Sequence, residues 1–208
     1  MATVEDRGDG RTVQLKKVRL TFTESLKEAR STVEDGVPKH TCTIILESDS
    51  PSFEENKKKI MSAIEAACEK EWKAKDKWKT IAEDDPKRVA FRKGERFKNR
   101  DGQVYGGFEG NYGLAVSGPA GGKKRPKMLD RHKRPVETED ILDVVYPGTY
   151  ADVVVSFYGT KKGGNGVFAS VEAIRSHQEG ERMGGGVQVD ADDFDDLDDD
   201  DEGDDDLL

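Results

Sequence analysis

The sequence predicts a mainly β domain with one major helix and elaborated loops, followed by an acidic tail. Three observations lead to this prediction: short stretches of alternating hydrophobicity toward both ends of the domain, one amphipathic stretch between them, and an abrupt change of composition near residue 184. The chain has 208 residues, a net charge of -9 and 37% charged residues. Roughly 180 residues precede the tail, which is enough for one domain with a single core. We therefore expect a folded domain at 13–183 and flexible segments at 1–12 and 184–208.

The first β segment, residues 13–22, alternates with a single change of parity. Its apolar positions fall into two groups, Val13 and Leu15, then Val18, Leu20 and Phe22. The change falls at Lys16–Lys17, and a one-residue slip in a period of two is what a β-bulge produces. A strongly bent first strand helps to close a small barrel. A second strand is predicted at 41–47, with a common face formed by Cys42, Ile44 and Leu46.

A single long helix is predicted after the second strand. Ser50 precedes Pro51 as a candidate N-cap, and Ser52 with Glu55 offers an overlapping capping box. From there, apolar residues recur at spacings of three and four to about Trp72 or Trp78, namely Phe53, Ile60, Ile64, Ala67 and Cys68. We expect this narrow stripe to lie against the sheet and the lysine-rich face to be in water.

The remaining strands lie in the second half of the chain. A glycine-punctuated stretch at 105–117 indicates a strand or hairpin, and two strong strands are predicted at 149–158 and 166–174, with a hairpin loop at 159–165. Their expected core faces are Ala151, Val153, Val155 and Phe157 in one strand and Val167, Ala169, Val171 and Ala173 in the other. A helix inserted between the early and late strands of a small barrel is typical of the OB-fold, the oligonucleotide/oligosaccharide-binding barrel.

The acidic tail, residues 190–208, holds thirteen carboxylates and no Lys or Arg, whereas the residues before it have a balance of +4. Such a segment cannot bury enough apolar surface to offset the entropy of ordering it, so we expect a disordered polyanion after a glycine hinge at 184–186. A polyanion tethered to a basic domain competes for that basic surface through its high effective concentration.

The positive charge of the domain is concentrated between Pro86 and Arg134, where fourteen basic and four acidic residues occur. Cations clustered in this way predict contacts with the phosphates of a nucleic acid. The candidate phosphate contacts are Lys93, Arg96, Lys98, Arg100, Lys123, Lys124, Arg125 and Lys127, with Lys16, Lys17 and Arg19 of the bulged strand as secondary candidates.

Aromatic residues are threaded through the first half of this basic segment. A channel for a single strand needs flat rings for unpaired bases as well as cations, and each stacked base contributes about 1 to 3 kcal/mol. The stacking candidates are Phe91, Phe97, Tyr105, Phe108 and Tyr112. The alternative is that these rings fill the core and that the charges only keep long loops in water.

No catalytic residue, cofactor or metal ligand is predicted. The run Ser117–Lys124 is similar to a phosphate-binding loop, but its glycines are one residue too close, and Lys124 stands where Ser or Thr should hold magnesium. Cys42 and Cys68 are expected to be buried, reduced thiols. No window approaches the run of about 18 apolar residues that a membrane span needs, so no membrane contact is expected.

Three stretches of the chain resemble a family of bacteriophage single-stranded DNA-binding proteins. They are Val18–Phe22, Pro38–Leu46 leading into the Pro51 helix, and above all Pro147–Tyr158 followed by Gly163–Val167. The likeness covers most of positions 13–186. The family is similar in design to the T7-type phage single-strand binder, an OB barrel with an acidic C-terminal tail, and this implies that the chain is not an enzyme.

The resemblance also implies partners and a location. It implies a protein of the cytoplasm of the infected bacterial host that protects single-stranded DNA in replication, recombination and repair, with a tail that contacts replication or recombination proteins and competes with DNA. Many such tails end in Phe, whereas this one ends in two leucines, so the candidate partner contacts are Phe194, Leu197, Leu207 and Leu208. A homodimer is left open.

Other functions remain open from the residues alone. The same charges suit an architectural protein that binds duplex DNA or RNA. The tail also suits a protein-interaction adaptor or a histone-like chaperone. A metal-dependent nuclease would need clustered carboxylates, for which the chain offers Glu137, Glu139, Asp140, Asp143 and Asp152.

Overall fold

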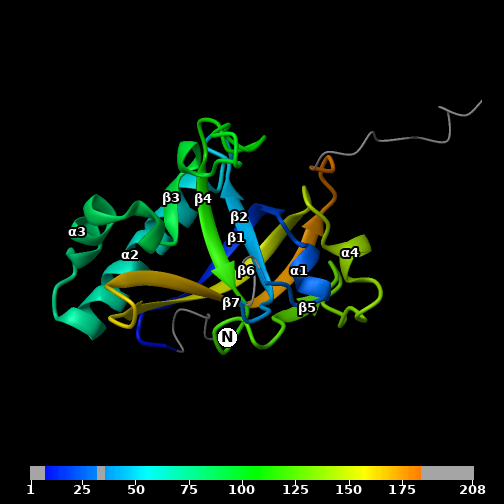
Figure 1. Ribbon diagram of the computed structural model, residues 1–208. Helices are drawn as coiled ribbons and strands as arrows, with labels where there is room; N and C mark the ends of the chain where they lie inside the picture. Colours follow the sequence, from blue (N-terminus) through cyan, green and yellow to red (C-terminus); the bar gives the residue numbers. More distant parts are fainter. Residues whose placement is uncertain (1–7, 32–35, 184–208) are drawn as a thin grey trace, which may run out of the picture.

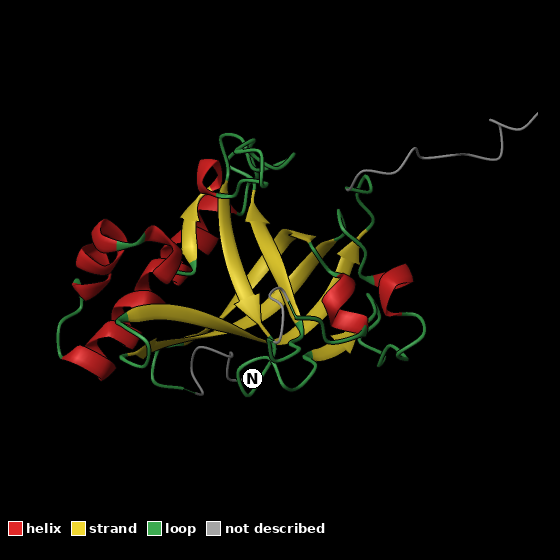
Figure 2. Cartoon of the chain, in the orientation of Figure 1, coloured by secondary structure: helices red, strands yellow, loops and turns green. Residues whose placement is uncertain are grey.

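Seven strands form one sheet in the computed structural model, which describes residues 8–31 and 36–183 (Figure 1, Figure 2). The strands are β1 (Thr12–Thr21), β2 (Thr41–Leu46), β3 (Phe91–Lys93), β4 (Tyr112–Ser117), β5 (Lys127–Leu129), β6 (Tyr150–Thr160) and β7 (Gly166–Gln178). The helices are α1 (Glu24–Lys27), α2 (Phe53–Trp72), α3 (Lys77–Asp84) and α4 (Ile141–Val144), with short 3-10 turns η2 (Pro86–Arg88) and η3 (Gly94–Arg96). Figure 1 shows α2 and α3 at one end of the sheet and α1, α4 and β5 at the other.

The sheet closes on itself into a barrel. Its order is β3-β4-β2-β1-β6-β7-β5, and a parallel pairing between β4 and β7 at Ser117 and Ser170 joins two strands that are distant in this order. The strands β4, β2, β1, β6 and β7 therefore form the ring, and β3 and β5 extend it at the edges. With one long helix between the early and late strands, this arrangement confirms the mainly β, OB-type architecture expected from the sequence.

The predicted bulge in the first strand is confirmed. The register between β1 and β6 shifts between Leu15 and Val18, and Lys17 takes a left-handed φ of 49°. The N–H groups freed by the shift are bound by side chains: Lys16 N donates to Asn56 Oδ1 at 3.0 Å and Lys17 N donates to Asp152 Oδ1 at 3.0 Å. Two buried polar groups thus hold the bend that lets β1 pair with both β2 and β6.

The long helix α2 packs on β6 and β1 through the predicted stripe, all of whose members are buried. The N-cap is Ser52, as the capping-box prediction placed it, and not Ser50. The Ser52 side chain makes no capping hydrogen bond, because its hydroxyl donates to Lys16 O on the bulge instead. The helix ends at Trp72, where Lys73 takes a left-handed φ of 58°. None of the helices in the described ranges combines the length and the apolar character needed to cross a bilayer.

The β6–β7 hairpin forms the longest antiparallel pair of the sheet. The residues predicted to face the core from β6, Ala151, Val153, Val155 and Phe157, are fully buried. The prediction for β7 is wrong at its last member, because the register shifts where Val154 pairs with Ala173 and Val155 with Val171. Ile174 takes the buried place, and Ala173 is only partly buried.

Both cysteines, Cys42 and Cys68, are buried and free, as the sequence predicted. Burial raises the pKa of the Cys42 thiol to about 12. The neutral thiol is a poor nucleophile, so Cys42 acts as a small apolar core residue.

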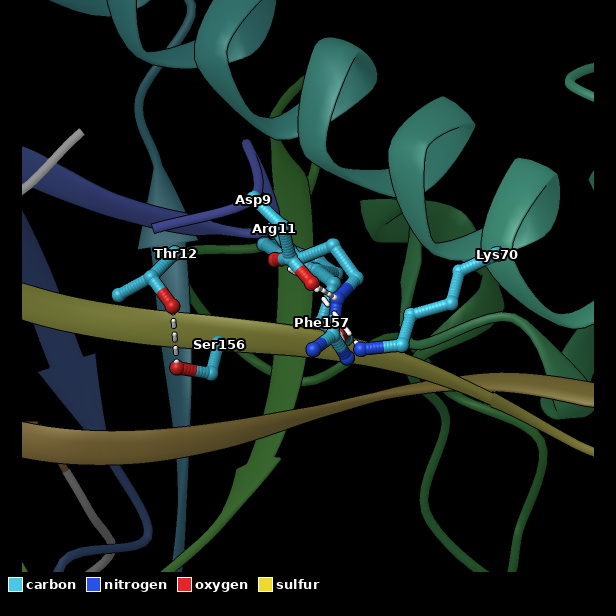
Figure 3. Close-up of polar contacts among 6 residues, drawn as sticks. All are labelled: Asp9, Arg11, Thr12, Lys70, Ser156 and Phe157. Carbon is cyan, nitrogen blue, oxygen red and sulfur yellow. Dashed lines mark hydrogen bonds and ion pairs between the residues drawn. The ribbon is translucent and has the colours of Figure 1, made fainter. Parts of the chain in front are cut away.

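The start of β1 is anchored to the end of α2 (Figure 3). Asp9 accepts hydrogen bonds from Arg11 Nε at 2.8 Å and from Lys70 Nζ at 3.1 Å, while Thr12 and Ser156 join their hydroxyls at 2.8 Å across β1 and β6. The hydrogen bonds from Arg11 and then Lys70 lower the pKa of Asp9 to about 2. These contacts begin inside the segment that the sequence analysis assigned to the flexible N-terminus; residues 1–7 of that segment, like the predicted tail, lie outside the described residues.

Asp9→Asn is expected to lower the free energy of unfolding slightly, by at most about 0.2 to 1 kcal/mol at neutral pH, because the pair is exposed to solvent. A depressed folded-state pKa stabilises the fold above the ordinary value of 3.8 and loses that effect as pH falls toward 2. Urea denaturation of the wild-type and Asp9→Asn proteins should therefore show a difference in the free energy of unfolding that shrinks between about pH 4 and pH 2. Glu109→Gln, at an exposed loop position, is the control; a constant difference across this range would contradict the assignment.

Candidate functional site

A concavity of about 690 Å³ lies on the face of β2 and β4 that points away from the barrel core. Its floor consists of small side chains, Thr41, Thr43, Ala115 and Ser117, whereas the alternating neighbours Ile44 and Leu114 are buried. Three rings and two cations stand around this floor: Phe22, Tyr158, Phe168, Lys39 and Lys162. We call this concavity the aromatic groove.

Tyr158 and Phe168 form the side of the groove that belongs to the hairpin. They are directly paired in the β6–β7 register, with ring centroids 6.2 Å apart and planes tilted by 43°. Both rings are partly exposed, although their chain neighbours Phe157 and Val167 are fully buried. Alternation along the two strands therefore places two rings together on the outer face.

Arg88 fixes the position of this aromatic pair. Its guanidinium lies 5.6 Å from the Phe168 ring centroid, and it donates to Asn165 O and Gly164 O at 2.6 Å each. Trp72 Nε1 donates to Asn165 Oδ1 at 3.3 Å from the end of α2. The hairpin tip that carries Lys162 is thus held from two sides.

The opposite side of the groove is formed by Phe22, which follows the last residue of β1. Its ring meets Tyr105 edge to face, with centroids 5.0 Å apart. The two rings are 38% and 39% exposed, and both also line a neighbouring concavity of about 460 Å³. Parity placed Phe22 on the core face, but a left-handed φ of 53° turns it outward. Strained backbone at an exposed ring is a common sign of a binding site.

The five predicted stacking rings have different locations. Phe91 is buried in the main core, and Phe97 and Phe108 stack on each other at 4.6 Å in a second apolar cluster with Ile45. The rings of Phe97 and Phe108 are 8% and 0% exposed, so in this structure they pack within the cluster and do not face the groove. Tyr112 is partly buried and stacks on Phe91 at 5.3 Å. Tyr105 is the predicted ring that stands exposed beside the groove.

Glycine explains why Phe97 is buried despite its place in a long loop. A Cβ at Gly113 would overlap the Phe97 ring, and a Cβ at Gly94 would overlap the backbone of Phe108. Absence of these side chains lets the loop of residues 94–111 lie directly on β4. Gly94 and Gly113 therefore allow the close approach of this loop to the barrel.

Three of the predicted phosphate contacts, Lys93, Arg96 and Lys98, line one concavity of about 730 Å³ at the edge of β3. Lys87 and Arg92, which the sequence analysis did not select, line it too. We call this concavity the cationic pocket. Arg100 is exposed in the loop that follows and lines neither the groove nor the pocket.

The second basic cluster divides into exposed and structural residues. Lys123 and Lys124 are exposed on a loop that packs against Lys39 of the groove, since a Cβ at Gly122 would contact the Lys39 side chain. Arg125 instead holds α1, donating to Leu26 O at 2.9 Å, to Lys27 O and to the Thr138 hydroxyl at 2.8 Å. Its guanidinium is therefore engaged within the fold, whereas Lys127 is exposed on edge strand β5.

The secondary candidates stand apart from the groove. Lys16 and Lys17 are exposed on the bulge of β1. Arg19 donates to Glu47 Oε1 at 3.2 Å and to Glu181 O at 3.0 Å, so its charge is partly compensated. It lines the smaller concavity beside Phe22 and Tyr105. The predicted partner contacts of the tail, Phe194, Leu197, Leu207 and Leu208, lie outside the described residues.

The carboxylates of the nuclease alternative do not converge on one metal site within the described residues, where no group of three or more His, Cys, Asp or Glu is placed to hold an ion. Asp152, the member on β6, is buried and pairs with Arg175 while accepting from Lys17 N. Its role is to hold the bulge.

Tyr158 and Phe168 were not among the predicted stacking rings, although the alternation of the two strands indicated their position. The two rings occupy the parity opposite to the core residues of the two strongest strands, and a hairpin between those strands necessarily brings them close. The cations Lys39 and Lys162 carry no such signal, because isolated lysines in loops and hairpin tips are usually only solvated.

Comparison with known proteins shows that the chain is similar to phage proteins. A family model described as "Enterobacter phage Enc34, ssDNA-binding protein" matches residues 11–207. The structure is similar to that of the single-stranded DNA-binding protein from bacteriophage Enc34 in complex with ssDNA, with a TM-score of 0.67, 18% identity, and coverage of 84% of this chain and 90% of that one. A second structure of the single-stranded DNA-binding protein from bacteriophage Enc34 gives a TM-score of 0.65 at 19% identity, with coverage of 88% of this chain and 89% of that one.

A more distant likeness is to gp2.5, a single-stranded DNA-binding protein encoded by bacteriophage T7, with a TM-score of 0.50 and 10% identity over 90% of this chain and 98% of that one. At these identities the solved structures establish the fold. No curated protein sequence gives a significant match.

Proposed function

The chain belongs to the family of the Enterobacter phage Enc34 single-stranded DNA-binding protein, and on this premise we propose that it binds single-stranded DNA in the aromatic groove without sequence preference. The family is one of phage DNA-binding proteins and not of enzymes, as the sequence indicated. The resemblance drawn from short motifs is thereby confirmed over most of the chain.

The observation that carries this proposal is the composition of the groove. Partly exposed rings of Tyr158 and Phe168 stand opposite the exposed ring of Phe22 across a floor of small side chains, with Lys39 and Lys162 at the rim. Unpaired bases offer π-faces that such rings can stack on, and phosphates pair with the lysines. In a duplex the same faces are covered by neighbouring base pairs, so the rings favour a single strand.

The acidic segment 190–208 supplies the second part of the proposal. Its thirteen carboxylates compete with DNA for the basic surfaces, and displacement by DNA frees it to contact replication or recombination proteins. These roles place the protein in the cytoplasm of the infected host, where phage DNA is replicated. Family membership and charge support this part.

Fluorescence anisotropy of labelled oligo-dT and of a duplex of equal length, titrated across salt with the full chain and with residues 190–208 removed, tests the proposal. We expect tighter binding to oligo-dT than to the duplex, and a gain in affinity on removal of the segment that is largest at low salt. Equal affinity for the duplex, or for an RNA oligonucleotide titrated in the same way, would favour an architectural protein. Absence of binding in both forms would favour the adaptor, and degradation of the oligonucleotide on adding magnesium would indicate a nuclease.

A further inference from the structure

The cationic pocket concentrates net positive charge at the edge of β3. Its five basic residues, Lys87, Arg92, Lys93, Arg96 and Lys98, come from η2, β3, η3 and the loop that follows. Across residues 8–31 and 36–183, none of the five forms an ion pair with a carboxylate. Side chains of like sign that share a concavity repel each other, so the arrangement favours an anionic occupant.

The two carboxylates that line the pocket are engaged with the backbone. Asp85 Oδ1 accepts from Lys87 N at 2.9 Å at the start of η2. Glu95 Oε1 accepts from Gly110 N at 3.1 Å, and hydrogen bonds from the N–H groups of Glu95 and Gly110 lower its pKa. Both groups therefore fix the loops that carry the cations, and they leave the pocket with a formal balance of +3.

Arg92 is held in place without using all of its donors. Its guanidinium lies 4.4 Å from the centroid of the buried Phe97 ring, and its Nη1 donates to Lys87 O at 3.1 Å. Nε is buried and has no hydrogen-bond partner in the part of the chain that the structure describes. Because Arg92 covers the Phe97 ring, the pocket offers charge but no ring on which a base could stack.

The pocket adjoins the aromatic groove through consecutive residues. Arg88 contacts Phe168 of the groove, and its neighbour Lys87 lines the pocket. Ala90, two residues on, accepts a hydrogen bond from Ala115 N of the groove floor and donates to Val167 O. A DNA strand that leaves the groove beside Phe168 would therefore reach the pocket across residues 87 and 88.

We propose that the cationic pocket is a phosphate subsite that extends the DNA path beyond the aromatic groove, holding the phosphodiester backbone without stacking its bases. This inference rests on the proposed function. It divides the interface into a part that depends mainly on rings and a part that depends on charge. Only strands long enough to reach past Arg88 occupy both parts.

The test is a salt titration of the full chain with an oligo-dT series from about 4 to about 16 nucleotides, the range of site sizes of single OB folds. The test variant is Lys93→Ala/Arg96→Ala/Lys98→Ala, which keeps Arg92 on Phe97. The control variant, Lys58→Ala/Lys75→Ala/Lys79→Ala, also removes three exposed lysine or arginine charges, from positions that line neither concavity.

For the longest oligonucleotides we expect the test variant to reduce the slope of log affinity against log salt by about 0.7 for each phosphate that the protein no longer neutralises, to a total of about 2. For the shortest it should keep the wild-type slope, and the control variant should keep it at every length. If the test variant keeps the wild-type slope at every length while the wild-type protein binds DNA, the subsite proposal is overturned and the proposed function is not. Failure of the wild-type protein to bind any member of the series would instead overturn the proposed function itself.

A third result would identify a different occupant. If the test variant binds long oligo-dT more tightly than the wild-type chain does, and this gain disappears once residues 190–208 are removed from both, the pocket holds the acidic segment and the subsite proposal is wrong.

Discussion

Replacing Tyr158 and Phe168 together by Ala is expected to weaken binding of oligo-dT by about 2 to 6 kcal/mol, because each ring supplies a stacking face worth about 1 to 3 kcal/mol. Even the lower value corresponds to about 30-fold in Kd. Both rings are on the outer face of the hairpin, so the barrel core below them, including Phe157 and Val167, is left intact. Anisotropy titration at fixed salt measures the loss of affinity, and a thermal melt checks that the variant is folded.

Two matched variants separate stacking from other effects. Tyr158→Phe/Phe168→Tyr keeps both ring faces and should retain affinity close to that of the wild-type protein. Tyr112→Ala removes a ring that packs on Phe53 and Phe91 and lines none of the groove, so it should affect stability rather than affinity. A folded Tyr158→Ala/Phe168→Ala protein with unchanged affinity would exclude the hairpin rings from the interface.

The strands and the long helix were predictable because alternation and three-and-four spacing report burial directly. The bulge at Lys16–Lys17 is an example, since a change of parity in the sequence corresponds to the register shift in β1. The second shift, opposite Val154, left no clear mark because both Ala173 and Ile174 are apolar. One of the two predicted helix starts, Ser52, is the N-cap, but its side chain does not cap the helix, because the Ser52 hydroxyl donates to the bulge, a tertiary contact that local sequence does not contain.

The types of residue at the candidate site, cations and aromatic rings, were predictable from the sequence, but their positions were predictable only in part. Of the predicted phosphate contacts, Lys93, Arg96 and Lys98 share one pocket, whereas Arg125 holds the backbone of α1. Arg side chains serve both purposes, and which one applies depends on carbonyl groups brought near by the fold. The groove combines residues from β2, β4, β6 and β7 with Phe22, which follows β1, so that no single stretch of sequence displays it.

The rings were the hardest to assign, because an aromatic residue in a glycine-rich loop suits both a binding surface and a small apolar cluster. Phe97 and Phe108 pack on Ile45, whose side chain lies on the outer face of β2. Ile44, Ile45 and Leu46 form an uninterrupted apolar run in the sequence, and all three are buried. An apolar run without alternation indicates a strand that is covered on both faces, so it was the sequence evidence that another segment covers this face. The loop of residues 94–111 is that cover.

Phe108→Ala is expected to lower the free energy of unfolding by about 3 to 5 kcal/mol, as is typical of truncating a fully buried Phe. The substitution removes the ring that stacks on Phe97 at 4.6 Å, and the loop that supports Tyr105 beside the groove is then without its main apolar anchor. Urea denaturation, followed by tryptophan fluorescence, measures the decrease in stability. Phe108→Leu fills most of the space that the Phe108 ring occupies, so it should lower the free energy of unfolding by less than Phe108→Ala does.

Phe108→Leu also decides between packing and stacking. If Phe108 acts only through packing, the folded Leu variant should bind oligo-dT with an affinity within about twofold of the wild-type value. If the ring instead stacks on a base, Leu should weaken binding by about 1 to 3 kcal/mol while changing stability little. The second outcome would mean that the loop of residues 94–111 opens on binding DNA, and it would return Phe108 to the set of interface rings.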